Sequence, residues 1–349
     1  MKKSALKARK EAAARLQLRK QAADDKAILA GIAASDITAL SQAITLIEST
    51  RPEDEIRAGE LVESCLNRAT PGIRVGITGV PGAGKSTFIE TLGLYLVGKG
   101  HRVAILAVDP SSSLSKGSIL GDKTRMQELG RNPGAFIRPS PAGDSLGGVA
   151  RKTRESITLC EAAGFDIILV ETVGVGQSEV AVHGMVDFFL LLKIAGAGDE
   201  LQGIKRGIVE MADAIVINKA DGPNLIAAEK AKSIFKSALH LYPPKENGWS
   251  PPVLLCSSTE GSGITEIWQM IGDYATSCRA DGSFENKRTN QNIHWLNQRI
   301  ESALTADFYR NPQIKKAFEA IKTKVIRKEL SPTRAANELL ELYHSQSKG

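Results

Sequence analysis

The sequence has few cysteines and no long hydrophobic run. Its four cysteines, Cys65, Cys160, Cys256 and Cys278, form no CxxC pair and have no neighbouring histidine, so no zinc site is predicted. We interpret them as reduced, structural thiols. The most apolar run, residues 188–194, is far shorter than the ~20 residues that a membrane span needs. It predicts a buried strand instead.

The first twenty residues also lack the apolar centre of a secretory signal. An intracellular protein is therefore expected, cytoplasmic or, in a eukaryote, in the mitochondrial matrix. The segment holds one acidic residue, Glu11, which leaves an organelle transit peptide open, but a solvated helix is the simpler interpretation. Much of the net charge of +6 lies in this segment rather than among aromatic residues, so nucleic acid is not expected as a partner. A membrane is not expected either, because no apolar run is long enough to span one.

The chain changes character along its 349 residues. Residues 35–69 have helical periodicity, with Leu40, Ile44 and Ile47 on one face. From there to about residue 271, short runs rich in Ile and Val alternate with helical segments, which predicts a mostly parallel sheet covered on both faces. The expected strands are 73–78, 103–108, 167–170, 188–194, 214–217 and 253–256, with a further possible strand at 135–138.

The carboxyl-terminal part is predicted to be a separate helical element. A polar stretch at 281–291 precedes a helical pattern whose apolar stripe is Ile314, Phe318, Ile321 and Val325. Such a stripe packs either on the main domain or on a second copy of the chain, and the sequence leaves both open.

A phosphate-binding loop follows the first expected strand. Residues 79–86 read GVPGAGKS, a complete Walker A motif, and a helix is predicted over 87–97. Glycines let successive N–H groups curl around phosphate, while Lys85 reaches the β- and γ-phosphates and Ser86 offers its hydroxyl to Mg²⁺. The residues predicted to form this cradle are Gly79, Val80, Pro81, Gly82, Ala83, Gly84, Lys85, Ser86 and Thr87.

Two later strands run into acidic residues. Asp109 follows strand 103–108 and Glu171 follows strand 167–170, and in a parallel sheet both ends open beside the loop. Both carboxylates are candidate Mg²⁺ ligands, Glu171 through water, although either one could merely cap the next helix. Gly174 is expected to bring an N–H to the γ-phosphate. Asp122 is a weaker metal candidate.

A guanine-reading motif follows strand 214–217. Asn218, Lys219 and Asp221 complete the pattern NKxD, in which Asp221 accepts hydrogen bonds from groups that adenine does not present. Asn218 is expected to tie loops together, and Lys219 to lie along the base. After the next strand, Ser257, Ser258 and Thr259 are placed to offer an amide to the guanine carbonyl.

These motifs predict an α/β P-loop NTPase with a mostly parallel central sheet that binds GTP or GDP with Mg²⁺. It is flanked by N- and C-terminal helical elements, so the expected organisation is a helical segment at 1–70, a GTPase domain at 71–277 and a helical element at 278–349.

The chain resembles the MeaB/ArgK family, the chaperone GTPases associated with methylmalonyl-CoA mutase. The resemblance covers roughly 35–275, and the segments that carry it are 79–86, 108–112, 121–126, 170–179, 195–205 and 218–221. It implies a homodimer formed through the C-terminal element. It also implies work on an adenosylcobalamin-dependent acyl-CoA mutase: gating of cofactor loading, and protection or rescue of the enzyme. The loop 195–205 is implied to relay the nucleotide state.

The hydrolytic groups are less clearly marked than the binding groups. Ras-like enzymes orient the attacking water with a Gln directly after the switch glycine, whereas here Val175 follows Gly174 and Gln177 comes later. Slow intrinsic hydrolysis that a partner accelerates is therefore expected, with Lys85, Asp109 and Gln177 as the catalytic candidates.

Three other functions are weighed against this one. A nickel-delivering GTPase generally carries Cys and His near its nucleotide, whereas this chain has the isolated His101 and His183. A small-molecule kinase fits the phosphate loop, but the guanine reader argues against it. A non-catalytic, nucleotide-dependent scaffold differs only in turnover.

Overall fold

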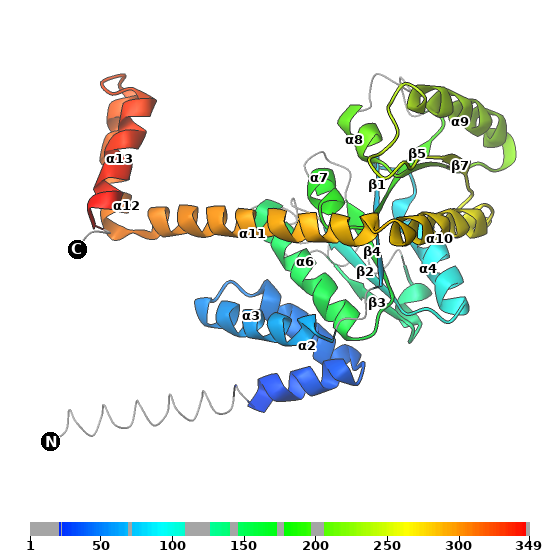
Figure 1. Cartoon of the computed structure of the whole chain (residues 1–349), viewed down its shortest axis with the longest axis horizontal. Helices are drawn as coiled ribbons and strands as arrows, with labels where there is room; N and C mark the ends of the chain where they lie inside the picture. The colour runs from blue at the N-terminus through cyan, green and yellow to red at the C-terminus, as the bar shows by residue number, and fades with distance from the viewer. Residues whose placement is uncertain are drawn as a thin grey trace. The chain divides into compact units, whose positions relative to one another are not determined.

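The computed structural model describes residues 21, 23–68, 72–108, 126–139, 146–172, 178–196 and 206–346. They form two compact units, Met1–Glu285 and Asn286–Gly349, which are considered separately below (Figure 1). The expected boundaries after residues 70 and 277 stay a prediction. The helical segment before residue 70 belongs to the first unit.

The first unit is built on a seven-stranded parallel sheet with the order β3-β2-β4-β1-β5-β6-β7. This confirms the predicted α/β fold and every expected strand, including 135–138. Three strands are longer than expected, because Gly79, Glu171 and Asn218 still pair within the sheet, and the last strand ends one residue early, at Leu255. The strands are β1 (Ile73–Gly79), β2 (Val103–Val108), β3 (Ala135–Arg138), β4 (Ile167–Thr172), β5 (Phe188–Ile194), β6 (Ala214–Asn218) and β7 (Val253–Leu255).

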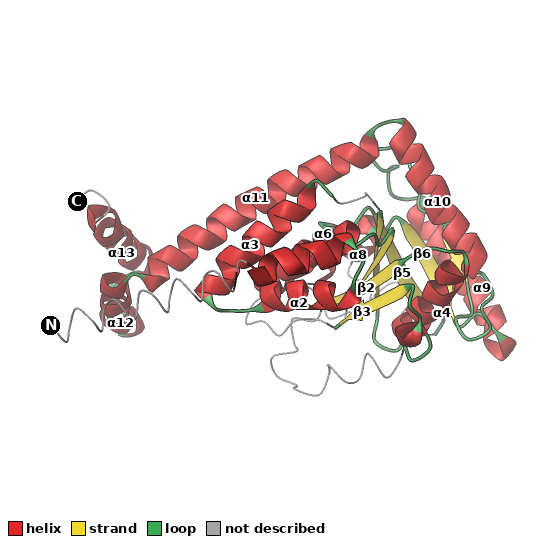
Figure 2. Cartoon of the chain, turned by 90° about the horizontal axis from the view of Figure 1, so that it is seen from below, coloured by secondary structure: helices red, strands yellow, loops and turns green. Residues whose placement is uncertain are grey.

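Helices cover both faces of this sheet, as its continuous apolar strands require (Figure 2). On one face, α4 (Lys85–Gly98) and α10 (Ile264–Ala280) bury a core with Phe88, Leu92 and Ile267. The helices on the other face are α6 (Leu146–Ala162), α7 (Ser178–His183), α8 (Arg206–Met211) and α9 (Leu225–Leu239). Short 3-10 turns lie at Leu129–Arg131 and Gly222–Asn224.

The amino-terminal helices α2 (Ile37–Glu48) and α3 (Pro52–Leu66) pack on α6. Leu40, Ile44 and Ile47 are buried, as the helical spacing predicts. Polar contacts add to this packing, because the Lys152 ammonium donates to the Glu48 carbonyl at 2.7 Å and Arg138 pairs with the Glu48 carboxylate. Helices α2 and α3 therefore belong, with α6, to the helical layer that covers β2 and β4.

An aspartate precedes each of β4, β5 and β6 and joins it to the neighbouring strand. The aspartate amide donates to the carbonyl of one residue in, or directly before, the neighbouring strand, and the aspartate carboxylate accepts from the amide of that same residue at 2.7–2.9 Å. We call this arrangement an aspartate clip. The three clips are Asp166 with Arg102, Asp187 with Arg74, and Asp213 with Phe189.

The expected polar break at 281–291 is wrong. Helix α10 ends at Ala280 and α11 (Ser283–Arg310) begins after two residues. Gly282 makes this turn with φ 77°, and the Asp281 carboxylate accepts from the Ser283 amide at 2.8 Å. Phe284 then enters the core of the first unit, so the polar composition marks the exposed side of a helix rather than a loop.

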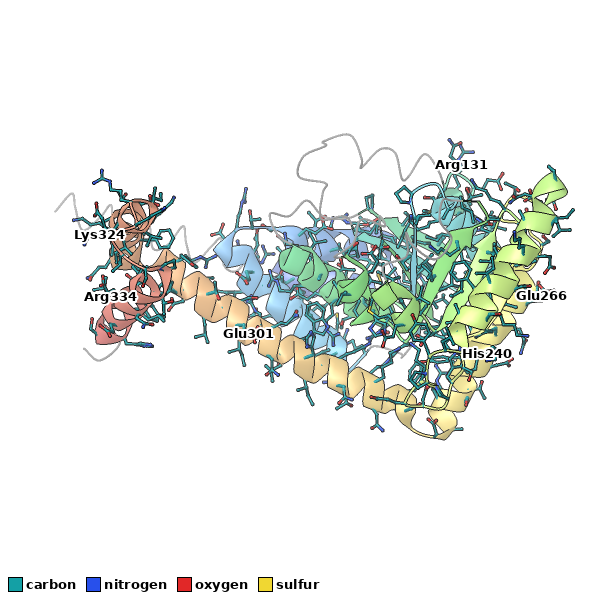
Figure 3. All side chains as sticks on the ribbon, turned by 90° about the horizontal axis from the view of Figure 1, so that it is seen from above. Arg131, His240, Glu266, Glu301, Lys324 and Arg334 are labelled. Carbon is teal, nitrogen blue, oxygen red and sulfur yellow. The ribbon has the colours of Figure 1, made fainter. Side chains whose placement is uncertain are left out.

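The second unit contains the rest of α11 with α12 (Pro312–Ile326) and α13 (Pro332–Gln346). Helix α12 packs on α13. Within its stripe, Ile314 is fully buried, and the Phe318 ring lies 5.8 Å from that of Tyr309 at the end of α11. The sequence predicts the main domain or a second copy as the partner of this stripe, and does not predict α13. Charged side chains such as Lys324 and Arg334 lie on the outside of this helix pair (Figure 3).

None of the described helices is long and apolar enough to cross a membrane.

Candidate functional site

The loop between β1 and α4 has the backbone geometry of a phosphate cradle. Gly82 and Gly84 have φ values of 81° and 85°, a left-handed conformation that only glycine adopts without strain. A Cβ on Gly79 would lie 2.3 Å from the Leu192 carbonyl oxygen, so the strand end also requires glycine. The helix begins at Lys85, two residues before the expected start, so its amino terminus directly follows the loop.

Lys85 turns back toward the loop from the first position of α4. Its ammonium donates to the Gly79 carbonyl at 2.9 Å and to the Val80 carbonyl at 3.4 Å. The positive charge is therefore held beside the same backbone whose amides form the cradle. This is the position from which an ammonium reaches the outer phosphates of a nucleotide.

Ser86 and Glu171 meet on the metal side of the cradle. The Ser86 hydroxyl lies 3.3 Å from the Glu171 carboxylate, which is 8% exposed. Glu171 lies inside β4 rather than beyond it, which corrects the expected strand end. A hydrogen bond of 2.8 Å between the Thr172 and Thr78 hydroxyls ties the end of β4 to that of β1. The ends of the two strands are thus locked beside the loop.

The oxygen donors of this corner fit Mg²⁺. Mg²⁺ takes oxygen ligands, and in phosphate-binding sites it usually keeps waters and needs one or two protein ligands besides the phosphates. Ser86 and Glu171 supply such oxygens. The other metal and switch residues predicted from the sequence, Asp109, Asp122, Gly174 and Gln177, lie outside the described residues.

Asn218 joins the base-binding side to the phosphate loop. It is 1% exposed, and its Nδ2 donates to the Ala83 carbonyl at 2.8 Å. Its Oδ1 accepts from the amide and hydroxyl of Ser258 at 3.1 and 2.8 Å and from the Cys256 thiol at 3.3 Å. Burial raises the pKa of that thiol to about 12, so Cys256 stays a protonated donor. One side chain thus connects three loops.

Asp221 lies at the mouth of this network. Its carboxylate accepts from the Ser257 hydroxyl and, at 3.5 Å, from that of Thr259. Lys219 adopts φ 58°, and its Cε lies 3.9 Å from the position of a Cβ on Gly84, so its stem runs beside the cradle. Two neighbouring hydroxyls hold the carboxylate that the sequence predicts to read guanine.

The segment 257–259 has one amide with no acceptor among the described residues. The Ser257 amide donates to the Ser262 carbonyl and the Ser258 amide to Asn218. The Glu260 amide donates to the Ser257 hydroxyl. The Thr259 amide is therefore the donor that this segment offers to a ligand.

Sequence reasoning missed two contributors to this site. One is Cys256, which the sequence predicts only as a structural thiol and which donates to Asn218. Thr91, on α4, donates to the Ser258 carbonyl at 2.7 Å. Nothing in the spacing of a single sequence connects positions so far apart, so only the folded chain reveals this contact.

Comparison with known proteins agrees with this geometry. Residues 40–313 match the family model described as methylmalonyl Co-A mutase-associated GTPase MeaB. The chain is 49% identical over 307 residues to a probable GTPase of Mycobacterium tuberculosis, covering 88% of this chain and 91% of that protein. It is 45% identical over 326 residues to the mitochondrial methylmalonic aciduria type A homolog of Mus musculus, covering 90% and 79%.

A solved structure is also similar. The crystal structure of a protein named LAO/AO transport system kinase superposes with a TM-score of 0.74 at 37% identity, covering 92% of this chain and 98% of that one. Family model, sequence relatives and fold agree over most of the chain. The chain belongs to the family of methylmalonyl-CoA mutase-associated GTPases.

Proposed function

We propose that this chain hydrolyses GTP in order to gate cofactor loading into an adenosylcobalamin-dependent acyl-CoA mutase and to protect or rescue that enzyme. The observation that carries the proposal is the Asn218 link, which joins the phosphate cradle at Ala83 to the base-reading loop at Ser258. A nucleotide that contacts both loops therefore contacts two parts of the site that Asn218 connects directly. The family is named for its association with methylmalonyl-CoA mutase, so we propose that enzyme as the client.

The chain's own groups divide the work of hydrolysis. Lys85 places positive charge beside the β- and γ-phosphates, and the loop amides hold their oxygens. Water attacks the γ-phosphorus and the bond to the β,γ-bridging oxygen breaks. GDP leaves with that electron pair, and the attacking water's proton is released with phosphate. Asp109 and Gln177 are our proposed groups for orienting this water, with the Gly174 amide on the γ-phosphate.

Ser86 and Glu171 would hold Mg²⁺, with Asp109 and Asp122 as further proposed ligands. Held there, the ion would supply positive charge that stabilises the charge developing on the leaving group. Replacing Ser86 by Ala should raise the Mg²⁺ concentration needed for half-maximal turnover, with GDP affinity in EDTA unchanged. An unchanged Mg²⁺ dependence would remove Ser86 from the metal site.

Hydrolysis is proposed to be slow until the mutase binds. Val175 occupies the position at which Ras-like enzymes carry their water-orienting Gln. Completion of such a site by a partner is worth ~10³–10⁵ in rate. The test is single-turnover GTP hydrolysis with and without an adenosylcobalamin-dependent mutase from the same source. A fast intrinsic rate that the mutase leaves unchanged would contradict the proposal.

A homodimer formed through the C-terminal helices is proposed as the working assembly. Four exposed apolar side chains recur along α11 at spacings of three, four and four residues: Ile293, Leu296, Ile300 and Leu304. Such a stripe on a long helix is typical of a helix–helix contact. Replacing Ile300 and Leu304 by Glu should halve the mass measured by light scattering. A wild-type monomer would exclude the dimer.

The name of the solved relative gives a different activity, that of a kinase. A phosphotransfer assay with GTP and arginine or ornithine distinguishes the two functions. Transfer of the γ-phosphate to the amino acid would favour the kinase, and release of inorganic phosphate alone favours hydrolysis. The absence of any turnover, with or without the mutase, would favour a nucleotide-dependent scaffold.

A further inference from the structure

The segment that reads the base is held by α4 as well as by the guanine motif. Thr91 lies on α4, six residues after Lys85, and its hydroxyl has two acceptors within reach. One is the Thr87 carbonyl at 3.0 Å, the usual contact of a helical threonine with the preceding turn. The other, shorter at 2.7 Å, is the Ser258 carbonyl, 167 residues away in the chain.

The acceptor of this hydrogen bond belongs to the same peptide unit as the Thr259 amide, the donor that the segment offers to a ligand. The Ser258 carbonyl and the Thr259 amide are two ends of one planar peptide, and no peptide bond among the described residues is cis. In a trans peptide the C=O and N–H point in opposite directions. A donor that fixes the carbonyl on one side therefore fixes the direction of the amide on the other. It also polarises the peptide, which strengthens the N–H as a donor.

We propose that Thr91 is a positioning residue for guanine recognition, because its hydroxyl orients the peptide whose N–H, that of Thr259, donates to a 6-carbonyl on the bound purine. Thr91 itself does not touch the nucleotide. The proposal rests on the guanine reading assigned above to Asp221 and the segment 257–259. It adds that a residue on the phosphate-binding helix α4 orients a hydrogen-bond donor that recognises the base.

The other anchors of the segment leave this task to Thr91. Asn218 holds the amide and the side chain of Ser258, and the Ser262 carbonyl holds the amide of Ser257. These contacts fix the chain before the peptide in question. After it, the Thr259 hydroxyl donates to Asp221 at 3.5 Å and the Glu260 amide donates to the Ser257 hydroxyl. The Thr91 hydroxyl is the described contact that acts on the peptide plane itself.

The test uses the full-length chain and two nucleotides that differ in the 6-oxygen and in the N1–H that accompanies it. Equilibrium binding is measured for GDP and for 2-aminopurine riboside diphosphate, which keeps the 2-amino group and lacks the 6-oxygen. Thr91→Val should weaken GDP binding about three- to tenfold, the worth of one neutral hydrogen bond. It should change binding of the analogue less than about twofold, and Thr91→Ser should restore GDP binding because it keeps the hydroxyl.

Thr276→Val provides a matched control. The Thr276 hydroxyl, on α10, donates to the carbonyl four residues earlier at 2.8 Å, the helical contact that Thr91→Val also loses. This variant should leave both affinities unchanged. If Thr91→Val weakens binding of both ligands equally, or of neither, the Thr91 proposal is wrong. The assignment of Asp221 and the segment 257–259 to guanine recognition would still stand if the wild-type chain prefers GDP. Equal wild-type affinity for the two ligands would overturn both.

Discussion

Carboxylates have different hydrogen-bond partners at the amino-terminal and carboxyl-terminal ends of the parallel strands, here called the amino edge and the carboxyl edge of the sheet. At the amino edge, the carboxylates of Asp166, Asp187 and Asp213 accept strand amides in the aspartate clips. At the carboxyl edge, Glu171 accepts from the Ser86 hydroxyl and Asp221 accepts from the Ser257 hydroxyl. Hydroxyls rotate and exchange partners, whereas strand amides are fixed by the ladder. The kind of donor that the carboxylate accepts from thus distinguishes the structural edge from the ligand-binding edge.

The comparison makes the effects of substitution separable. Changes at the carboxyl edge should alter binding and turnover with little effect on folding. Changes at the amino edge should alter the free energy of unfolding and leave nucleotide preference as it is. Four substitutions test this division.

The largest effect is expected at Lys85. Replacing Lys85 by Ala removes the charge beside the cradle and should lower kcat/KM for GTP by about 10²–10³-fold. Turnover is measured with saturating Mg²⁺. Lys99→Ala, at the exposed end of the same helix, is the control and should retain full activity. Undiminished hydrolysis by the Lys85 variant would remove this lysine from the site.

At the base, Asp221→Asn should weaken GTP binding by about 1.5–3 kcal/mol, because two hydrogen bonds to a charged acceptor are lost. Preference should shift toward xanthine nucleotide, since the new amide matches the xanthine carbonyl. Calorimetry with GTP, XTP and ATP measures both changes. If the wild-type chain binds ATP as tightly as GTP, the guanine reading is wrong.

At the amino edge, Asp187→Ala should lower the free energy of unfolding by about 2–3 kcal/mol, because Asp187 is buried and the Arg74 amide loses its charged acceptor. Denaturant titration gives this value. The ratio of GTP to ATP affinity should not change. Asp273→Ala on α10, whose carboxylate accepts from Gln269 at the exposed surface, is the control. A shifted nucleotide preference in the Asp187 variant would break the division between the edges.

The smallest effect is expected at Asp166, whose side chain is 45% exposed. Its carboxylate accepts from the Arg102 amide at 2.7 Å and contacts His101 at 2.6 Å. Asp166→Asn keeps one oxygen for the amide, so stability should fall by only about 0.5–1 kcal/mol. A loss as large as that of Asp187→Ala would show that exposure does not grade the clips.

The sequence was sufficient for the elements and the binding motifs. Apolar runs placed all seven strands, and the glycine spacing predicted a cradle whose left-handed positions at Gly82 and Gly84 the structure shows. Errors fell at element ends: α4 begins at Lys85, β4 continues through Glu171, and a helix replaces the expected break after 281. Local composition does not reveal where pairing or capping stops, because those depend on neighbours in space.

What the sequence by itself determined is the order of motifs, since each is written in consecutive residues. The tertiary structure alone decided which distant groups meet: Ala83 with Asn218, Thr91 with Ser258, and the partner of each clip. It also placed α13 against α12, a contact that periodicity could not predict. The physical reason is that a hydrogen bond depends on distance and direction, and these exist only after the sheet has aligned its strand ends.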